Sequence, residues 1–422
     1  MKILLINKSA TQGGAAVAAF RLFEALKKHG VEVNLLVQDS AKSELGVHSL
    51  SNSFKGKQRS FGKFVAERVS FLPFEKDKSV RYTFSPAASG ENIVNHPLVQ
   101  EADVIHLHWI NHGFLSLKGL NRIFKLGKPI VWTMHDMWPF TGGCHYSGSC
   151  FEYIESCGNC PFLKKPSDKD LSYRILKHKH KIWEDANLNM VTCSNWLRNL
   201  ALDSTLLKSK PVISIPNPIN TDLFKPLDFK ECRKRFKLPI RKKLILFGAA
   251  NSSEPRKGIK YLLEALAYIK QNHPKWNDKM ELVVFGKTDK QLLDSFPYKT
   301  HNLKFIKSKT DLIKLYNAAD AFVLPSLQDN LPNTVMESLA CGTPVVAFNV
   351  GGVPEMIQHN KTGYLANVKD SDALAKGIIS VLEHQNIDEL QTEARDFVLK
   401  NYANAVVAEQ YHKLYNKVLN NK

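Results

Sequence analysis

Residues 320–348, DAFVLPSLQDNLPNTVMESLACGTPVVAF, contain a strand, a loop, a helix and a second strand in quick succession. The two apolar runs, Ala321–Pro325 and Thr343–Phe348, are short and carry almost no charge. Between them, residues 334–342 have the apolar spacing of a helix. Near-continuous apolar strands that are separated by helices indicate a parallel sheet covered on both faces. The segment therefore predicts an α/β fold with a doubly wound sheet.

The same alternation extends through the rest of the chain. In the first half, strands are predicted at 1–7, 31–38, 102–109, 128–135, 187–194 and 211–217, with a helix at 15–30 that ends in a glycine. In the second half, strands are predicted at 242–249, 280–287, 302–308, 320–326 and 343–348, and helices at 257–271, 310–321 and 334–342. The apolar spacing of one last helix covers 396–419.

Three prolines in PNPINTDLFKP, residues 216–226, interrupt both patterns and mark a joint. At 422 residues the chain is too long for one hydrophobic core and suits two domains of about 200 residues each. We expect two Rossmann-like domains with a cleft between them, over residues 1–218 and 219–400, followed by a terminal segment at 401–422. In such sheets ligands bind at the carboxyl ends of the strands, so residues that follow strands are the candidate site residues.

The charge balance bears on the partners of the chain. It carries 58 Lys and Arg against 40 Asp and Glu, a net charge of +18, with dense basic segments at 55–68 and 164–181. Solvated helix faces or attraction to an anionic membrane surface would explain these segments. We expect no nucleic acid as a partner, because the sequence has no nucleic-acid-binding pattern. No apolar run approaches the ~20 residues of a membrane span, and the start of the chain lacks a signal peptide, so we expect a cytoplasmic protein.

A glycine-rich loop follows the first predicted strand. In NKSATQGGAAVAAF, Gly13 and Gly14 open the first helix. Glycines at a helix N-terminus let backbone N–H groups approach a phosphate or a hydroxyl. The loop has neither the dinucleotide-binding nor the P-loop spacing, and a tight turn without a ligand is the alternative.

A second loop, ANSSEPRKGIKYLLEAL, follows the strand at 242–249 and opens a helix near Gly258. Arg256 and Lys257 are two cations beside that helix N-terminus. The guanidinium can bind two phosphate oxygens and the ammonium acts as a point charge, so the pair suits a diphosphate. A solvated basic turn is the alternative.

Histidines also follow strands of the first domain. His135 and Asp136 come directly after the strand at 128–135, where an imidazole can bind a ligand or transfer a proton. The alternative is a buried imidazole with satisfied hydrogen bonds. His106 and His108 share one face of the preceding strand, and we expect packing roles for both.

Two acids stand on either side of the helix start in the opening segment. Asp329 lies in the loop after the strand, and Glu337 lies in the helix that follows. Two carboxylates so placed can accept hydrogen bonds from a polyhydroxylated ligand. Thr334 and Glu337 also fit a capping box, with Thr at the N-cap and Glu at the third helical position, which would explain Glu337 without a ligand.

Four cysteines cluster in CHYSGSCFEYIESCGNCP, a Cys-rich insertion at 142–162: Cys144, Cys150, Cys157 and Cys160. Four thiolates suit tetrahedral zinc, and four protein ligands would make such an ion structural rather than catalytic. Unliganded thiols, a redox pair and an iron–sulfur site remain alternatives. Disulfides are disfavoured in the cytoplasm.

Taken together, residues 244–260 and 320–355 resemble the retaining glycosyltransferases of family four, which have the GT-B fold. The mark of that family is a pair of glutamates followed by CGTPVV; here Asp329 and Glu337 stand with seven residues between them. The segments PRKG, TMHD and IPNPINTDLFKP match as well, so the resemblance spans nearly the whole chain. The Cys-rich segment is similar to that of a subset that builds bacterial exopolysaccharides such as colanic acid. The resemblance also implies that the C-terminal helix packs back towards the N-terminal domain.

The resemblance implies a role for each candidate residue in moving a sugar from a nucleotide-sugar donor to a glycan or lipid-linked acceptor. The catalytic group would comprise His135, beside the sugar on the acceptor side, Asp329, on the sugar hydroxyls, and Lys257, on the donor diphosphate. Glu337 would bind the donor ribose. The donor-binding set would be Gly14, Arg256, Lys257, Asp329, Asn330, Leu331 and Glu337. No cofactor would be required, and the enzyme would work in the cytoplasm or peripherally at the inner face of the membrane.

The sequence departs from the family pattern at two places. The first acid is Asp329 in place of glutamate, which shortens the carboxylate arm by one methylene and leaves the choice of sugar open. The arginine that often follows the first strand of the second domain is replaced by Ala249-Ala250, and Arg256 would take over its role. Because of the changed acid, the alternative function is a catalytically inactive GT-B protein that binds a glycan or a partner.

Overall fold

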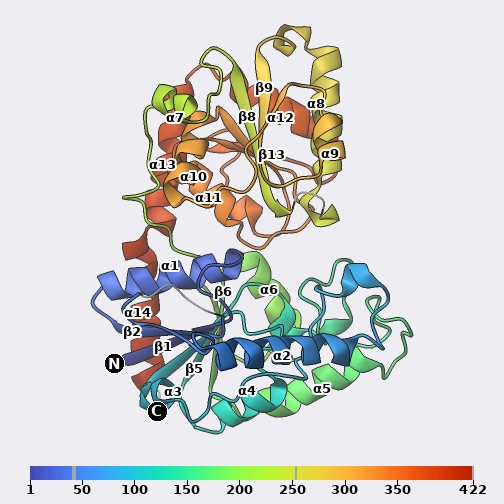
Figure 1. The fold of residues 1–422 in the computed structure, drawn as a ribbon, viewed down its shortest axis with the longest axis vertical. Helices are drawn as coiled ribbons and strands as arrows, with labels where there is room; N and C mark the ends of the chain where they lie inside the picture. Colours follow the sequence, from blue (N-terminus) through green and yellow to red (C-terminus); the bar gives the residue numbers. More distant parts are fainter. Residues whose placement is uncertain (40–43, 252–253, 421–422) are drawn as a thin grey trace. The chain divides into compact units, whose positions relative to one another are not determined.

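The chain forms two compact α/β units in a computed structural model, which describes residues 1–39, 44–251 and 254–420. Unit 1 comprises Met1–Pro218 and Val407–Lys422, and unit 2 comprises Ile219–Val406. Each unit contains its own parallel sheet with helices around it (Figure 1). None of the helices in the described ranges combines the length and hydrophobicity that a membrane span requires.

The sheet of unit 1 has seven strands in the order β3-β2-β1-β4-β5-β6-β7, and every neighbouring pair is parallel. The strands are β1 (Lys2–Asn7), β2 (Glu32–Val37), β3 (Val47–Ser49), β4 (Val104–Leu107), β5 (Ile130–Met134), β6 (Leu188–Thr192) and β7 (Val212–Ser214). The predicted strands of this half are all present. The edge strand β3 was not predicted, because it is three residues long and only partly buried.

Helices cover the sheet of unit 1 (Figure 1). They are α1 (Gly14–Lys28), α2 (Phe54–Phe71), α3 (Pro97–Glu101), α4 (Leu117–Phe124), α5 (Leu171–Trp183), α6 (Asn195–Asp203) and α14 (Asn404–Asn420), with short 3-10 turns η1 (Lys78–Val80), η2 (Trp138–Phe140) and η3 (Glu152–Ile154). The terminal helix α14 packs on this sheet, because Tyr415 and Tyr411 enter its core and hydrogen-bond His106 and Thr133 at 2.7 and 2.8 Å. The predicted return of the C-terminal helix to the N-terminal domain is thus confirmed.

The sheet of unit 2 has six parallel strands in the order β10-β9-β8-β11-β12-β13. They are β8 (Lys243–Asn251), β9 (Met280–Lys287), β10 (Thr300–Asn302), β11 (Ala321–Leu324), β12 (Val345–Phe348) and β13 (Gly363–Ala366). The strand predicted at 302–308 was wrong. β10 ends at Asn302, because Lys304 adopts a left-handed backbone conformation (φ 54°) that breaks the extended chain.

The helices of unit 2 include the one predicted within the opening segment. They are α7 (Phe229–Arg235), α8 (Ile259–Asn272), α9 (Lys290–Asp294), α10 (Lys309–Ala318), α11 (Asn333–Ala340), α12 (Ser371–Leu382) and α13 (Ile387–Tyr402), with 3-10 turns η4 (Pro255–Lys257), η5 (Pro274–Trp276) and η6 (Val353–Glu355).

The single helix predicted at 396–419 is two helices. The chain is extended at Ala403, between α13 and α14, and pairs there with Ile219. The backbone N–H of Ile219 donates to Tyr402 O at 2.9 Å, and Asn404 N–H donates to Ile219 O at 3.1 Å. Because these bonds join segments far apart in the sequence, the apolar spacing along the last helices gave no sign of the break.

Each sheet has one point where the strand order reverses. In unit 1, β2 and β4 lie on opposite sides of β1; in unit 2, β9 and β11 lie on opposite sides of β8. The connections leave such a pair of neighbouring strands in opposite directions, so a crevice opens at their carboxyl ends, where α/β proteins bind ligands. The loops after β8 and β11 and those after β1 and β4 therefore merit the closest inspection.

Candidate active site

The loops after β8 and β11 pack closely against each other in unit 2. Gly258, between η4 and α8, has a left-handed conformation (φ 66°), and a Cβ at this position would lie 1.8 Å from Pro325 O. Leu327 N–H donates to Arg256 O at 2.8 Å. Glycine is thus required at position 258 by both conformation and space. This contact sets Arg256 and Lys257 beside the loop that carries Asp329. Ser252 and Ser253 of the same loop lie outside the described residues.

The two cations of the first loop converge on the acid of the second. Lys257 Nζ lies 2.8 Å from Asp329 Oδ2, and Arg256 Nη1 lies 3.5 Å from Asp329 Oδ1. Arg256 also pairs with Glu254 at 2.8 Å and donates to the backbone O of Gln328 at 2.6 Å. The predicted catalytic pair of unit 2 is therefore one ion-paired cluster.

Charge and burial have opposite effects on the pKa of Asp329 in this cluster. Burial alone would raise the pKa of Asp329, but Lys257 and Arg256 hold that pKa below its usual range. The carboxylate side chain is 12% exposed, whereas the side chains of Lys257 and Arg256 are 20% and 27% exposed. The acid is ionised and enclosed, while both cations keep open surface for an anionic ligand.

The backbone around Asp329 is also fixed. Gly352 N–H donates to Asp329 O at 3.1 Å, and a Cβ on Gly351 would lie 1.9 Å from that oxygen. Asn330 and Leu331, the other predicted donor-binding residues of this loop, are buried and lead directly into α11. The loop after β11 is thus held at its start by η4 and at Asp329 by the glycines after β12.

The capping-box explanation of Glu337 is wrong. Helix α11 begins at Asn333 with Pro332 at the N-cap, so Thr334 lies inside the first turn and Glu337 lies beyond the third helical position. Glu337 is buried, and Tyr316 Oη donates to its Oε2 at 2.8 Å. Tyr316, on α10, is a partner that the sequence did not reveal. The carboxylate is therefore oriented by a phenol.

In unit 1 the predicted Gly14 is the first residue of α1. Gly13 is its N-cap, with φ 94° and no side-chain cap. A Cβ on Gly13 would meet nothing within 4 Å, so glycine is required there by conformation alone and the space beside it is open. The α1 N-terminus follows β1, at the strand where the order of the sheet reverses, and N–H groups at a helix start favour an anion or a hydroxyl.

His135 follows β5 and is held by two side chains from neighbouring strands. Its Nε2 lies 3.1 Å from His108 Nδ1, and its Nδ1 lies 3.5 Å from Cys193 Sγ. Cys193, which follows β6, donates to Asn217 Oδ1 at 3.1 Å. Burial lowers the pKa of His135 to about 4, so the imidazole is neutral at neutral pH. Cys193 and Asn217 were not singled out in the sequence, although both follow strands.

The three histidines stack on one another. The ring centroids of His106 and His108 are 4.3 Å apart, and those of His108 and His135 are 5.4 Å apart. Both ring nitrogens of His106 have partners, Tyr415 and Thr133 at 2.7 Å each, which confirms a packing role for this residue. His108 does more than pack, because it orients His135.

Asp136, the other residue of the predicted HD pair, braces the loop that leaves β5. Its Oδ2 accepts from Trp109 Nε1 at 2.9 Å and lies 2.8 Å from His145 Nδ1, while its Oδ1 accepts from Trp138 N–H at 2.9 Å. Burial would raise the pKa of Asp136, and His145 lowers it below its usual range. These contacts of Asp136 are structural, whereas His135, whose ring nitrogens also have partners, is the less buried of the two.

The four cysteines of the insertion line one small cavity in unit 1. They are Cys144, Cys150, Cys157 and Cys160, and all four are free thiols. Burial raises the pKa of Cys157 to about 12 and that of Cys160 to about 11. The four predicted cysteines thus line one cavity.

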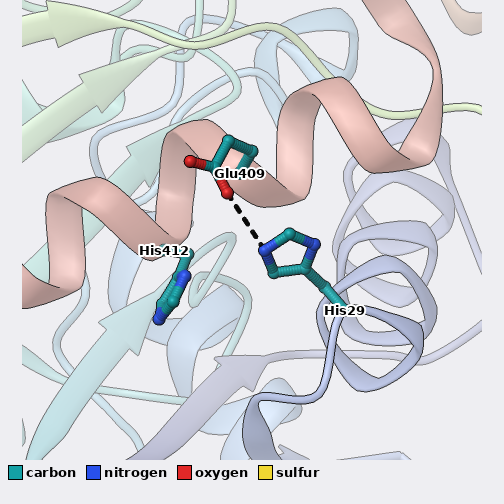
Figure 2. Close-up of side chains that lie close together, drawn as sticks. All are labelled: His29, Glu409 and His412. Atoms are coloured by element: carbon teal, nitrogen blue, oxygen red, sulfur yellow. Dashed lines mark ion pairs between the residues drawn. The ribbon is translucent and has the colours of Figure 1, made fainter.

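A second group of metal-type ligands joins α14 to the end of α1. In the parts of the chain that the structure describes, His29, Glu409 and His412 are the one group of three such residues whose ligand atoms lie within 4.8 Å of one another (Figure 2). His29 Nε2 lies 3.2 Å from Glu409 Oε2, and Lys413 Nζ lies 3.1 Å from the other oxygen of Glu409. His29 and Glu409 thus contact each other between the two helices, and the ion pair of Lys413 with Glu409 lies within α14.

Both halves of the chain match known glycosyltransferase family profiles. Residues 12–223 match the family profile "Glycosyltransferase Family 4", and residues 230–397 match "Glycosyl transferases group 1". The chain is 23% identical over 411 residues to the phosphatidyl-myo-inositol mannosyltransferase of Mycobacterium leprae, covering 96% of this chain and 93% of that one. It is also 23% identical over 383 residues to the putative colanic acid biosynthesis glycosyl transferase WcaC of Escherichia coli, covering 85% of each.

Solved structures agree on the fold. HepE of Anabaena, in a crystal structure with UDP-glucose, superposes with a TM-score of 0.64 at 16% identity, covering 99% of this chain and 100% of that one. At that identity the likeness concerns the fold, which is GT-B: two Rossmann-like domains with parallel sheets.

Proposed function

Because the chain belongs to glycosyltransferase family 4, we propose that it moves a sugar from a nucleotide-sugar donor to a glycan or lipid-linked acceptor with retention of anomeric configuration. The observation that carries the proposal is the cluster at the switch point of unit 2. There Arg256 and Lys257 present open cationic surface while Asp329 is held ionised between them.

The cations of this cluster suit the diphosphate of the donor. Lys257 and Arg256 come after β8, beside the N-terminus of α8, where helix N–H groups also favour an anion. When the bond between the sugar and the diphosphate breaks, negative charge grows on the leaving phosphate. Fixed cations that face this charge stabilise the transition state more than the ground state, which accelerates the reaction. In our proposal these side chains and the helix supply this stabilisation, and no metal cofactor is required.

The acids would hold the two sugars of the donor. Glu337, oriented by Tyr316, would accept hydrogen bonds from the ribose hydroxyls, because an ionised carboxylate is an acceptor with two oxygens. Asp329 would accept from hydroxyls of the transferred sugar near the reacting carbon, with Asn330 and Leu331 lining the same loop. Its ion pair with Lys257 would link sugar recognition to diphosphate binding.

In unit 1 we assign His135 to the acceptor side of the transferred sugar and Gly14 to the donor phosphate. His135 is neutral and its two ring nitrogens contact His108 and Cys193, so it would bond a sugar hydroxyl by exchanging one of these partners, without bringing a charge. The space beside Gly13, the N-cap of α1, is open.

The exposed face of helix α2 in unit 1 bears on the class of acceptor. Figure 1 shows α2 as a long helix along one side of that unit. Its buried face comprises Gly56, Ser60, Glu67 and Phe71, and Glu67 anchors it by accepting three backbone N–H groups from residues 87–89. The opposite face carries apolar side chains in open solvent: Phe54, Phe61, Val69 and Leu72 are 74%, 67%, 58% and 54% exposed.

These exposed side chains form one stripe with Val65, because they recur at intervals of seven, four, four and three residues. Two lysines flank the stripe at its N-terminal end, Lys55 and Lys57. An apolar helix face bordered by basic residues is typical of helices that lie in the interface of an anionic bilayer. We therefore propose that α2 rests on the cytoplasmic face of the membrane and that the acceptor is lipid-linked, as part of cell-surface polysaccharide synthesis.

A donor screen tests the proposed function. Purified protein is incubated with UDP-, GDP- and ADP-sugars, with UDP-glucose included first, and release of nucleoside diphosphate is measured with and without lipid-linked acceptors. We expect turnover with one donor class and a large increase when acceptor is added. If the protein binds a nucleotide sugar or a glycan but never turns over, the catalytically inactive binding protein is the correct assignment.

A further inference from the structure

The cysteine-rich segment between β5 and α5 takes no part in the proposed reaction, yet it is built around an enclosed space. All four of its cysteines line one cavity of about 20 Å³, which is room for a single atom-sized guest. The remaining lining is mainly apolar or glycine. We propose that Cys144, Cys150, Cys157 and Cys160 bind one structural zinc ion.

The backbone of the C-x2-C pair already has the tight turn that a metal knuckle needs. Cys157, Gly158 and Asn159 all have left-handed φ angles, of 51°, 123° and 46°. Gly158 N–H donates to Ser172 Oγ at 3.1 Å, and Cys160 N–H donates to Asp170 Oδ2 at 2.9 Å. Non-glycine residues rarely adopt this conformation unless surrounding contacts or a ligand hold it. The turn is thus preformed and fixed to the N-terminus of α5.

Backbone groups also act on two of the sulfurs. Burial raises the pKa of Cys157 and Cys160, and the backbone N–H groups of Gly142 and Phe162 act in the opposite direction on Cys157 and Cys160 respectively. Such groups favour the thiolate, the form that coordinates metal. The spacing from Cys160 to Phe162 places one of these donors within the knuckle itself.

A buried cation beside the cluster is the second, independent observation. Lys179, on α5, is completely buried, and its ammonium donates to the backbone O of Trp138 and, at 2.9 Å, of Thr141. It lies 3.5 Å from the centre of the Trp138 ring and interacts electrostatically with Cys144, Cys157 and the carboxylate of Asp136. In the described parts of the chain, Lys179 forms no ion pair at contact distance, so Asp136 acts on it from farther away.

A buried ammonium is costly when the acid that acts on it, here Asp136, lies beyond ion-pair distance. Zinc with four thiolates carries a net charge of −2, since four negative sulfurs surround one doubly positive ion. Such a centre next to Lys179 would supply the missing negative charge, and Lys179 would in turn offset part of the charge of the centre. Four thiols without a metal would supply none of it.

The sulfurs have to move inwards to bind the ion. Zn–S bonds of about 2.3 Å in a tetrahedron place sulfurs about 3.8 Å apart, whereas no three of these thiols fall within 4.8 Å of one another in the structure. Cys150 is the half-buried member of the set. Rotation of the four side chains into the cavity would bring the sulfurs together around the ion. Four protein ligands leave no position for substrate.

Metal analysis of the whole chain, purified without a histidine tag from zinc-supplemented cells under reducing conditions, tests the proposal. We expect about one zinc per chain, released on thiol modification, and less than about 0.2 in Cys157→Ser/Cys160→Ser. Cys232→Ser, outside the cluster, should keep its zinc. So should His29→Gln/His412→Gln, which removes the other group of metal-type ligands.

Loss of metal from the double cysteine variant does not distinguish a lost ligand from a lost fold, so a second measurement uses the wild-type chain. Cobalt exchanged into the site should give the thiolate charge-transfer and d–d absorption of tetrahedral Co–S₄ coordination. Less than about 0.2 zinc per wild-type chain together with no such spectrum would overturn the proposal. Iron with inorganic sulfide, or zinc that leaves with the histidine variant instead of the cysteine variant, would overturn it as well. None of these readouts depends on transferase activity.

Discussion

Lys257 Nζ and Asp329 Oδ2 are 2.8 Å apart, in an ion pair that joins the loop after β8 to the loop after β11. The pair sits where the strand order of the unit 2 sheet reverses, at the position where α/β sheets bind phosphates and sugars. Arg256 is a second cation on the same carboxylate, so an incoming diphosphate would meet two cations that are partly neutralised by Asp329 and Glu254. Two consequences follow, one for each partner.

Lys257→Ala should reduce kcat/KM for the donor by about 10²–10³-fold, because it removes a fixed cation that faces the leaving diphosphate. Arg256, 3.5 Å from Asp329, still partners the carboxylate, so we expect the chain to fold and the Tm to fall by only a few degrees. Steady-state kinetics and a thermal melt measure the two effects. Lys260→Ala, an exposed lysine of α8 one turn away, is the control and should leave kcat/KM unchanged. Full activity of Lys257→Ala would refute its assignment.

Asp329→Glu should change the ranking of sugar donors. The extra methylene moves the carboxylate by about one C–C bond, 1.5 Å, in a loop whose backbone is fixed by Gly351 and Gly352. The added volume should also cost about 1–3 kcal/mol of stability, because Asp329 is buried. The measurement is the ratio of kcat/KM between donors that share a nucleotide and differ in the sugar. A uniform change across all sugars would show that Asp329 does not select among them.

The sequence was sufficient to predict the strands that carry this cluster, for a physical reason. Strands buried on both faces of a parallel sheet must be apolar throughout, so β8 and β11 stand out, and the loops after them are located at once. Edge strands lack this signal: β13 has two residues that are only partly buried, and it was not predicted. The local pattern also predicted the wrong N-cap for α11. It indicated Thr334, whereas Pro332 is at that position.

The partners of the site residues could not be predicted in the same way. Tyr316 and Glu337 are 21 residues apart, and His135 and Cys193 are 58 residues apart. Such pairs are set by the order of strands in the sheet and by helix packing, which one sequence does not state. The ion pair of Lys257 and Asp329 spans 72 residues and belongs to the same class. The sequence indicated that Lys257 and Asp329 each follow a strand, but not that they form a pair.

Glu337→Gln should raise the KM for the donor about tenfold with little change in kcat. The carboxylate is proposed to bind the ribose hydroxyls equally in the ground state and the transition state, and hydrogen bonds to a charged group contribute about 1.5–3 kcal/mol. Tyr316→Phe should raise KM less, because it removes the phenol that orients the carboxylate while the charge stays. Glu231→Gln, on the exposed side of α7, is the matched control. A fall in kcat with unchanged KM would place Glu337 in the chemical step instead.

The buried histidines of unit 1 should make its stability fall in acid. Burial lowers the pKa of His106 to about 3, of His112 to about 2 and of His135 to about 4, whereas all three titrate near 6.5 when unfolded. Between the lowered pKa of each folded histidine and 6.5, the unfolded chain binds more protons than the folded chain. The stability is therefore fully present above about pH 6.5 and is lost as the pH falls below it, by about 1.4 kcal/mol per pH unit for each histidine.

Urea unfolding between about pH 7 and about pH 5 measures this slope. In His106→Gln the number of protons that the chain takes up on unfolding, which this slope measures, should be lower by about one. The variant should also be less stable at neutral pH. His178→Gln, an exposed position on α5, should leave the slope unchanged. The same slope in His106→Gln and in the parent chain would show that His106 is not held neutral in the folded state.

Phe54→Ser/Phe61→Ser should weaken binding of the chain to anionic vesicles by at least about tenfold. The two rings are 74% and 67% exposed on the outer face of α2, so their removal costs the folded state little, but each loses apolar area that would enter the bilayer interface. Lys55→Gln/Lys57→Gln should weaken binding to anionic vesicles by about 1 kcal/mol per residue and leave binding to neutral vesicles unchanged. Phe305→Ser, equally exposed but in unit 2, is the control. Sedimentation with vesicles of phosphatidylglycerol and phosphatidylcholine measures all three variants, and equal binding by the double phenylalanine variant and the parent chain would rule out α2 as the membrane contact.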